Sequence, residues 1–310
     1  MILRYGILST SSIAPRFIAG VREAKAGEVV ALSSRTLPKA QEKAALWGIP
    51  KAYGSHEELL CDPEVDIVYI STVNALHYKW AKAALEHGKH VVCEKPCTTS
   101  EADTRALFRL AREKGLFLME AEKMLFLPAV QELKQALEED KLGRIHMVRL
   151  SHSFPATYNG WMFDKSAGGG TLLSSGIYAV QLILHLFGPI RQLQGSFDRD
   201  ENGAEHQYVL SGQTEGGVLF SIHNSSCVPL DNTACFYGEK GWAELPEYWK
   251  ARKLHLHASG ATQTREFPCE HELMYEAAHI QACLQNGLTT SPVVTEKLSC
   301  DGIAALESLQ

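Results

Sequence analysis

The sequence predicts an α/β protein in two parts: a doubly wound parallel sheet, then an α/β domain with a large, mainly antiparallel open sheet. Over the first 120 residues, short apolar runs alternate with amphipathic stretches, which is typical of parallel strands joined by crossover helices. Beyond that point, strand-like segments follow one another closely and are separated by hairpin signals. For 310 residues two domains are expected, and we place the boundary at 121/122.

The first part, residues 1–121, has the strand-and-helix alternation of a Rossmann-type fold. The predicted strands are Arg4–Leu8, Val29–Ser33, Ile67–Ser71, His90–Cys93 and Leu116–Met119. The predicted helices are Ile13–Ala24, Pro38–Trp47, Leu76–His87 and Glu101–Lys114. Three of these helices are followed directly by glycine, at Gly48, Gly88 and Gly115, which is a common way for a helix to end.

The second part, residues 122–310, is richer in strands. The predicted helices are Ala129–Glu139, Gly176–Phe187, His271–Gln285 and Glu296–Leu309. The predicted strands are Ile145–His152, Gln192–Phe197, His206–Gln213, Gly217–His223, Thr233–Tyr237, Trp242–Leu245, Leu254–His257 and Gln263–Phe267. Turn signals such as Thr214–Gly217 between successive strands indicate antiparallel pairing.

The composition is that of an ordinary soluble globular protein, with 45% apolar and 21% charged residues. The net charge is −6 and no basic run is present, which argues against nucleic acid or an anionic membrane as a partner. No apolar run approaches the ~20 residues of a membrane span. The chain begins directly with a strand and lacks a signal-peptide pattern, so we expect a cytoplasmic protein.

The eight cysteines favour reduced thiols over disulfides or a metal site, because they form no CxxC pair and have no histidine at zinc spacing. They are Cys61, Cys93, Cys97, Cys227, Cys235, Cys269, Cys283 and Cys300. His255 and His257 share one face of a predicted strand, but no third ligand accompanies them. We therefore expect no metal.

The stretch Lys89–Pro96 is the first candidate for chemistry. It passes from an apolar strand into Glu94 and Lys95, and a helix-start signal, Thr98–Glu101, follows. Ligands of open α/β sheets bind at the carboxyl ends of the strands. Pro96 disfavours a helical Lys95 and so holds its ammonium on a turn. The alternative for this pair is a solvated loop before a helix.

The turn after the first strand, Gly6–Ala14, occupies the place of a dinucleotide phosphate loop. Serine stands at two of its glycine slots, Ser9 and Ser11, while Ala14 is acceptable at the third. Backbone amides and hydroxyls could still bind phosphate here. The candidate contacts are Ser9, Ser11, Ser12 and Ile13. The alternative is a serine-rich cap on the first helix.

The end of the second strand carries Ser34, Arg35 and Thr36 where an acidic residue would bind the ribose of NAD. Because no carboxylate is present and arginine suits a 2′-phosphate, these residues favour NADP over NAD. The alternative for Arg35 is a surface arginine at a helix start.

Several motifs together resemble the glucose-fructose oxidoreductase/inositol dehydrogenase (Gfo/Idh/MocA) family. In chain order these are Ser34-Arg35, Ser71-Thr72-Val73-Asn74-Ala75-Leu76-His77, Glu94-Lys95-Pro96 and Met119-Glu120-Ala121. The segment Gly168–Tyr178 is similar to the family's GGGxLxDxGxY pattern. Within the family, Gly176–Gln181 and Gly287–Pro292 resemble the dimeric dihydrodiol dehydrogenases.

This resemblance implies a Rossmann domain followed by a substrate-binding α/β domain whose open sheet packs in a homodimer. It implies that Lys95 lies beside the nicotinamide and the substrate, and that Tyr178 faces it across a cleft. The cofactor contacts that it implies are Ser71, Thr72, Asn74, His77, Glu94 and Lys95. In hydride transfer to a carbonyl, negative charge grows on oxygen, which a cation can stabilise and a phenol can protonate.

The chain departs from the family pattern at Ser174, which occupies the aspartate slot and carries no charge. A Tyr178–Lys95 pair is therefore favoured over a relay through a carboxylate. We assign Ser174, Ser175, His152 and Trp161 to the substrate pocket. Aromatic packing is the alternative for Trp161, and a packed core residue is the alternative for Tyr178.

We therefore predict an NADP-dependent oxidoreductase with a small-molecule substrate. It would interconvert a secondary alcohol and a ketone, or oxidise a vicinal diol, on a sugar, cyclic polyol or dihydrodiol-like molecule. Two alternatives stay open: a non-catalytic dinucleotide-binding sensor or corepressor, and an NAD-linked inositol-type dehydrogenase.

Overall fold

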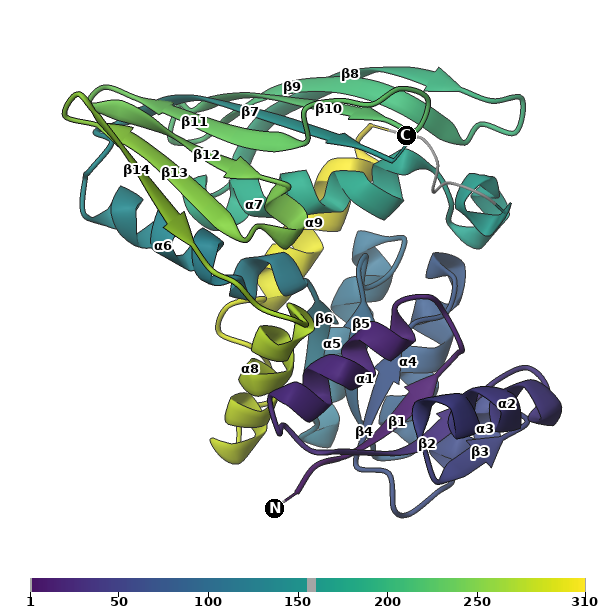
Figure 1. Cartoon of the computed structure of the whole chain (residues 1–310). Coiled ribbons are helices and arrows are strands. Elements are labelled where there is room, and N and C mark those ends of the chain that lie inside the picture. The colour runs from purple at the N-terminus through teal and green to yellow at the C-terminus, as the bar shows by residue number, and fades with distance from the viewer. Residues whose placement is uncertain (1, 155–159, 310) are drawn as a thin grey trace. The chain divides into compact units, whose positions relative to one another are not determined.

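The computed structural model describes residues 2–154 and 160–309 (Figure 1). The chain forms two compact units. The first contains Met1–Glu122 and His271–Cys300, and the second contains Lys123–Glu270 and Asp301–Gln310. Packing therefore groups residues 271–300 with the first unit, whereas the expected boundary at 121/122 divides the chain once.

The first unit is built on a six-stranded parallel sheet in the order β3-β2-β1-β4-β5-β6. Its strands are β1 (Arg4–Leu8), β2 (Glu28–Ser33), β3 (Lys51–Tyr53), β4 (Ile67–Ile70), β5 (His90–Glu94) and β6 (Leu118–Ala121). The strand order reverses between β1 and β4, which is where doubly wound sheets bind ligands. The predicted Rossmann-type fold is confirmed. Strand β3 was missed because three residues carry no usable periodicity.

Apart from α3, which was not predicted, the helices of the first unit begin and end close to the predicted positions. They are α1 (Ala14–Glu23), α2 (Leu37–Trp47), α3 (His56–Leu60), α4 (His77–Glu86), α5 (Glu101–Lys114) and α8 (Leu273–Gln285), with a 3-10 turn η1 (Asn74–Leu76). Helix α5 is capped by the hydroxyl of Ser100, which accepts from the Asp103 amide. Helix α8 packs on α1 at Gly20, where a Cβ would lie 2.7 Å from the Leu273 backbone.

The second unit is built on an eight-stranded sheet in the order β14-β13-β12-β11-β7-β10-β9-β8. Its strands are β7 (Ile145–Ser153), β8 (Ile190–Arg199), β9 (Glu205–Thr214), β10 (Leu219–Ser225), β11 (Thr233–Gly238), β12 (Gly241–Pro246), β13 (Lys253–Ala258) and β14 (Ala261–Glu266). All pairs are antiparallel except β7 with β10. The predicted mainly antiparallel sheet is confirmed.

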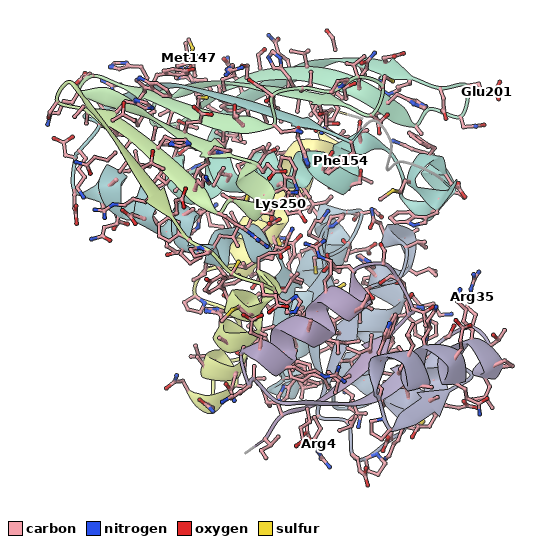
Figure 2. All side chains as sticks on the ribbon, viewed as in Figure 1. Arg4, Arg35, Met147, Phe154, Glu201 and Lys250 are labelled. Atoms are coloured by element: carbon pink, nitrogen blue, oxygen red, sulfur yellow. The ribbon has the colours of Figure 1, made fainter. Side chains whose placement is uncertain are left out.

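Helices lie on one face of this second sheet (Figure 1). They are α6 (Pro128–Glu138) and α7 (Ile177–Phe187), and α9 (Glu296–Glu307) runs from the first unit into the second. The short turns are η2 (Lys123–Phe126), η3 (Gly160–Phe163), η4 (Lys165–Ala167), the π-helical η5 (Leu172–Gly176) and η6 (Tyr248–Lys250). The opposite face exposes apolar side chains, among them Met147, which projects from the sheet in Figure 2.

Among the residues that the structure describes, Lys165–Phe187 is the one helical stretch long and apolar enough to cross a membrane. Of its most apolar window, 72% is buried inside the structure. Buried core helices of soluble proteins pass the same test of length and composition, so the stretch is weak evidence for a membrane span.

Candidate functional site

The carboxyl ends of β1, β2, β4 and β5 lie at one edge of the parallel sheet, as their registers require. Leu8 pairs with Ser33 on one side and with Ile70 on the other, and Ile70 pairs with Cys93. The predicted phosphate, ribose and nicotinamide contacts follow these strand ends. The first unit therefore gathers them at the crevice where doubly wound sheets bind dinucleotides.

The turn after β1 keeps the shape of a phosphate loop although serine replaces glycine. Ser9 has a φ of 93°, in the region that favours glycine, and its amide donates to the Ser33 carbonyl at 3.1 Å. No side chain caps the amino end of α1 at Ile13. The Ser11 hydroxyl donates to the Ser71 hydroxyl at 2.8 Å, which ties the loop to the end of β4. The first amides of α1 are largely engaged, because Ala14 donates to the Ser11 carbonyl, Arg16 donates to the Ile13 carbonyl, and Pro15 has no N–H. Phosphate binding by this loop therefore stays a prediction.

The end of β2 has a cationic environment. Ser34 is buried, and Arg35 is exposed and extends away from the ribbon in Figure 2. His56, which shares a 2.8 Å hydrogen bond with the Ser33 hydroxyl, has a pKa below its ordinary value because of burial. The Glu57 carboxylate opposes this effect, and Lys79 and Arg35 add to it. Two cationic side chains and one carboxylate therefore act on this imidazole. Sequence reasoning found Arg35 but missed Lys79, which lies far along the chain.

His77 braces two loops of the site. Its Nδ1 lies 2.8 Å from the Pro96 carbonyl oxygen and its Nε2 lies 3.1 Å from that of Thr72. Burial lowers the pKa of His77, and the two carbonyls oppose that effect. Asn74, three residues earlier in the chain, is also buried and lies on η1. Both ring nitrogens thus lie at backbone carbonyl oxygens, so His77 holds together the loops after β4 and β5. Its contact with the cofactor stays a prediction.

Lys95 follows β5 among carboxylates of the first unit. Its backbone amide donates to Glu94 Oε2 at 3.3 Å, and Glu94 in turn accepts from the Tyr69 hydroxyl. Burial lowers the pKa of Lys95 below its ordinary value. Three carboxylates oppose this by favouring the ammonium; they belong to Glu94, Glu122 and Glu120. The half-buried Glu94–Lys95 pair therefore lies beside the buried carboxylates of Glu120 and Glu122.

Tyr178 begins helix α7 of the second unit and is bonded to a lysine that the sequence reasoning did not single out. The Nζ of Lys123 donates to the Tyr178 hydroxyl at 2.8 Å and lies 4.5 Å from the ring centroid. Lys123 is 6% exposed and Tyr178 is 8% exposed. No local signal could have joined two residues 55 positions apart.

An aromatic cluster surrounds His152, whose ring neighbours Tyr178. His152 of β7 has its ring centroid 6.3 Å from that of Tyr178 and 3.6 Å from that of Trp249. Phe154 contacts His152 at 3.9 Å between centroids, and Tyr248 does so at 5.8 Å. The predicted pocket residue His152 is thus brought together with Tyr178. Phe154, Tyr248 and Trp249 were missed, because single aromatic residues in a sequence are usually core residues.

The remaining predicted pocket residues of the second unit make internal contacts. The Ser174 hydroxyl donates to the Gly170 carbonyl at 2.7 Å. The Ser175 hydroxyl donates to the Thr171 carbonyl and accepts from Asn224 at 2.7 Å. Trp161 lies on η3 and is 37% exposed. Their roles toward a substrate stay predictions.

The glycines of Gly168–Gly170 are required by close packing. A Cβ on Gly169 would lie 2.5 Å from the Trp161 carbonyl oxygen, and one on Gly170 would clash with the Glu205 carboxylate. Gly170 also has a φ of 108°. The glycine run therefore lets the chain turn tightly before η5 and α7, which positions Tyr178.

A family model described as "Oxidoreductase family, NAD-binding Rossmann fold" matches residues 3–122, and the model of the GFO/IDH/MocA C-terminal domain matches residues 130–244. The chain belongs to the GFO/IDH/MocA oxidoreductase family. The predicted resemblance is confirmed, and this family member is an oxidoreductase with an NAD(P)-binding Rossmann fold.

Two curated relatives match almost the whole chain of this family member. Trans-1,2-dihydrobenzene-1,2-diol dehydrogenase of Mus musculus is 34% identical over 312 residues, covering 95% of this chain and 92% of the relative. The enzyme of the same name from Bos taurus is 35% identical over 311 residues, with the same coverage. The likeness to dihydrodiol dehydrogenases, first suggested by Gly176–Gln181, is therefore found over both units.

Solved structures share the fold. A 3-ketoreductase from Actinomadura kijaniata, in complex with NADP and TDP-benzene, has a TM-score of 0.91 at 22% identity and covers 100% of this chain and 97% of its own. An aldose-aldose oxidoreductase from Caulobacter crescentus has a TM-score of 0.90 at 24% identity and covers 99% and 96%. At these identities the likeness establishes the α/β fold.

The part of the chain that the structure describes holds no group of three or more His, Cys, Asp or Glu side chains arranged for a metal. His255 and His257 instead share hydrogen bonds with Thr264 and Thr262 of the neighbouring strand. All eight cysteines are free thiols in the structure.

Proposed function

We propose that this oxidoreductase is an NADP-dependent enzyme acting on a secondary alcohol, ketone or vicinal diol of a sugar, cyclic polyol or dihydrodiol-like small molecule. The observation that carries the proposal is the buried phenol of Tyr178, which accepts a hydrogen bond from an ammonium and stands beside the His152 ring. A phenol in this setting can exchange a proton with a substrate oxygen. The names of the relatives, which act on diols and sugars, support the same substrate class.

The cofactor, when bound, supplies nicotinamide C4 as the hydride acceptor or donor. The chain's own residues handle the oxygen of the substrate. Tyr178 takes the hydroxyl proton during alcohol oxidation and returns it during ketone reduction. Lys95 orients that oxygen and stabilises its developing negative charge. The three carboxylates around Lys95 support this role because they favour its ammonium form and so oppose the effect of burial on its pKa.

The residues at the edge of the parallel sheet fit a dinucleotide. The position of the Ser9 turn, between β1 and the start of α1, supports a pyrophosphate contact there. The proposed contacts are Ser9, Ser11, Ser12, Ile13, Ser34, Arg35, Thr36, Ser71, Thr72, Asn74, His77, Glu94 and Lys95. The preference for NADP over NAD rests on Arg35, which is exposed and forms no ion pair with the carboxylates that the structure describes. Its guanidinium suits a 2′-phosphate.

The substrate pocket is proposed to lie along the aromatic cluster, with His152, Trp161, Ser174 and Ser175 contributing. Rings that line a pocket bind the apolar faces of a cyclic substrate, while hydroxyls and imidazole contact its oxygens. The stacked His152 and Trp249 rings offer such a face. This favours a cyclic polyol or dihydrodiol over a linear sugar acid.

We also propose a homodimer through the open face of the eight-stranded sheet, in the cytoplasm, with no nucleic acid or membrane as partner. Met147, Leu219 and Tyr237 are 50%, 48% and 38% exposed. They are neighbours, because Met147 of β7 pairs with Leu219 of β10 and with Tyr237 of β11. A contiguous apolar row of this kind favours association with a second copy. Sedimentation of the Met147→Lys variant tests this: the dimer should give way to monomer.

A panel of sugars, cyclic polyols and trans-dihydrodiols, scored by nicotinamide absorbance with NADP and NAD, tests the function. We expect turnover of at least one cyclic diol with NADP. A panel without turnover, together with tight dinucleotide binding, would favour the sensor or corepressor. Turnover confined to inositols with NAD would favour the inositol-type dehydrogenase.

A further inference from the structure

The hydrogen bond between Lys123 and Tyr178 has no role in the chemistry described so far. We propose that Lys123 is a positioning residue that keeps the Tyr178 hydroxyl ready to accept the substrate's proton, through an ammonium supplied by the second unit itself. The inference rests on the proposed acid/base role of Tyr178. It adds a second lysine, distinct from Lys95, which belongs to the first unit.

The geometry is specific to the phenol oxygen. Lys123 Nζ lies 2.8 Å from it, within the range of a strong charge-assisted hydrogen bond, and 4.5 Å from the ring centroid. An ammonium can only donate, so the phenol oxygen is the acceptor. A cation that donates to this oxygen favours the phenolate, which is the form that accepts a proton from an alcohol. During oxidation the alcohol proton passes to this oxygen while Lys123 keeps donating its own N–H.

Both partners are fixed by their surroundings. Lys123 begins the turn η2, in which Met124 and Leu125 are completely buried and which packs on η6. Tyr178 lies in the first turn of α7, held by the glycine-dependent bend before η5. Because the backbone of each partner is already ordered by packing, the contact requires only the two side chains to be ordered in addition. The bond is thus set by tertiary packing within the second unit.

Other titratable groups near Tyr178 are few in the described part of the second unit. His152 of β7 has its ring 6.3 Å away, and Tyr248 of η6 stands behind His152. From α9, Gly302 packs on Ile177 and Gln181 of α7, and Asp301 is its neighbour in sequence. On α7 itself, burial lowers the pKa of His185 to about 4, so that side chain is neutral near neutrality. Lys123 is the cation whose hydrogen bond to the phenol is described above.

The decisive test compares wild type with Lys123→Met, which keeps most of the length of the side chain and removes its charge, and Lys123→Arg, which keeps the charge. Protein containing carbon-13 labelled tyrosine is titrated without cofactor, with the Tyr178 signal assigned from Tyr178→Phe. We expect Tyr178 to ionise about 1–3 pH units higher in Lys123→Met than in wild type. Lys123→Arg should stay close to wild type. Equal ionisation in all three proteins would overturn the proposal.

The kinetic readout separates positioning from a general structural defect. For alcohol oxidation by Lys123→Met, we expect the rising limb of the pH profile to move to higher pH, with turnover reduced about tenfold or more near neutrality and recovering in alkaline buffer. KM for NADP should not change. A parallel loss at every pH would show a structural role and contradict the proposal. Lys240→Met, an exposed lysine of the same unit paired with Asp140, is the matched control and should behave as wild type.

The failure of this inference and that of the proposed function are distinguishable. If Tyr178→Phe keeps full activity, the acid/base role is wrong and the inference falls with it. If Tyr178→Phe is inactive while Lys123→Met has the wild-type pH profile, the acid/base role stands and the role of Lys123 is wrong. His152→Gln checks that a shift in the profile does not come from the neighbouring imidazole.

Discussion

The two units place their functional side chains in different ways. In the first unit, the candidate residues follow the ends of parallel strands and are held largely by backbone groups, as with Ser9 on the Ser33 carbonyl and His77 on two loops. In the second unit, Tyr178 depends on side chains from η2 and β7 that come from distant parts of the chain. A nucleotide site can thus be built from a local pattern, whereas the substrate side requires tertiary contacts.

The largest expected effect tests whether both units contribute a cation to the same reaction. Lys95→Met should abolish turnover, because no other side chain of the first unit is proposed to stabilise the substrate oxygen. NADPH binding, followed by fluorescence titration, should remain largely intact. Lys123→Met should retain measurable activity at alkaline pH. Unchanged turnover in Lys95→Met would remove the first unit's lysine from the chemistry and leave the Lys123–Tyr178 pair to act alone.

A smaller effect is expected where the first unit selects its cofactor. Arg35→Ala should weaken NADPH binding roughly 10–100-fold, because charge-assisted hydrogen bonds contribute about 1.5–3 kcal/mol. NADH binding should not change, since the lost contact is to the 2′-phosphate. The control is Lys43→Ala, a partly exposed lysine of α2 that pairs with Glu42. Tighter binding of NADH than NADPH by wild type would contradict the role given to Arg35.

Acid should affect the first unit more than the second. Burial lowers the pKa of four of its histidines, namely His56, His77, His90 and His279, against His185 in the second unit. A histidine whose pKa is lower in the folded protein binds its proton more tightly in the unfolded chain. The free energy of unfolding therefore falls as the pH drops below ~6.5. Each group contributes at most about 2 kcal/mol of loss near pH 5.

Hydrogen exchange measured peptide by peptide, at about pH 7 and about pH 5 with correction for the intrinsic rate, tests this difference between the units. Amides of β4 and β5 should lose protection on acidification to a greater extent than amides of β7 and β10. His77→Gln should reduce the acid sensitivity of the first unit. Equal loss in both units would contradict the histidine explanation.

The smallest expected effect concerns the phosphate loop. Ser9 has a φ of 93°, which glycine adopts without strain, so Ser9→Gly should raise the free energy of unfolding by up to about 1 kcal/mol. Ser12→Gly is the control. Ser12 is exposed and does not have a positive φ, so glycine relieves no strain there. Glycine at this position only increases the conformational freedom of the unfolded chain, which lowers stability. Thermal unfolding of both variants measures the difference. A Ser9→Gly protein no more stable than Ser12→Gly would show that the loop is unstrained.

The sequence determined the nucleotide half of the candidate site because its signals are local. Strand ends, helix starts and the residues that follow them can be recognised within short windows, which is why the positions of Ser11, Ser71 and Lys95 at the sheet edge were expected. Helix α5 was predicted to the residue, since its serine cap and terminal glycine are both visible in the sequence. Short elements such as β3 and α3 were missed, because too few residues repeat.

The tertiary structure alone decided the partners of Tyr178. The sequence pointed to this tyrosine and to the neutral Ser174 through a motif, but nothing local connects position 178 with the lysine 55 residues before it. Phe154, Tyr248 and Trp249 likewise gather around His152 only because β7 and η6 fold together. Periodicity records which face of an element is buried; which side chains then meet depends on the packing of elements far apart in the chain.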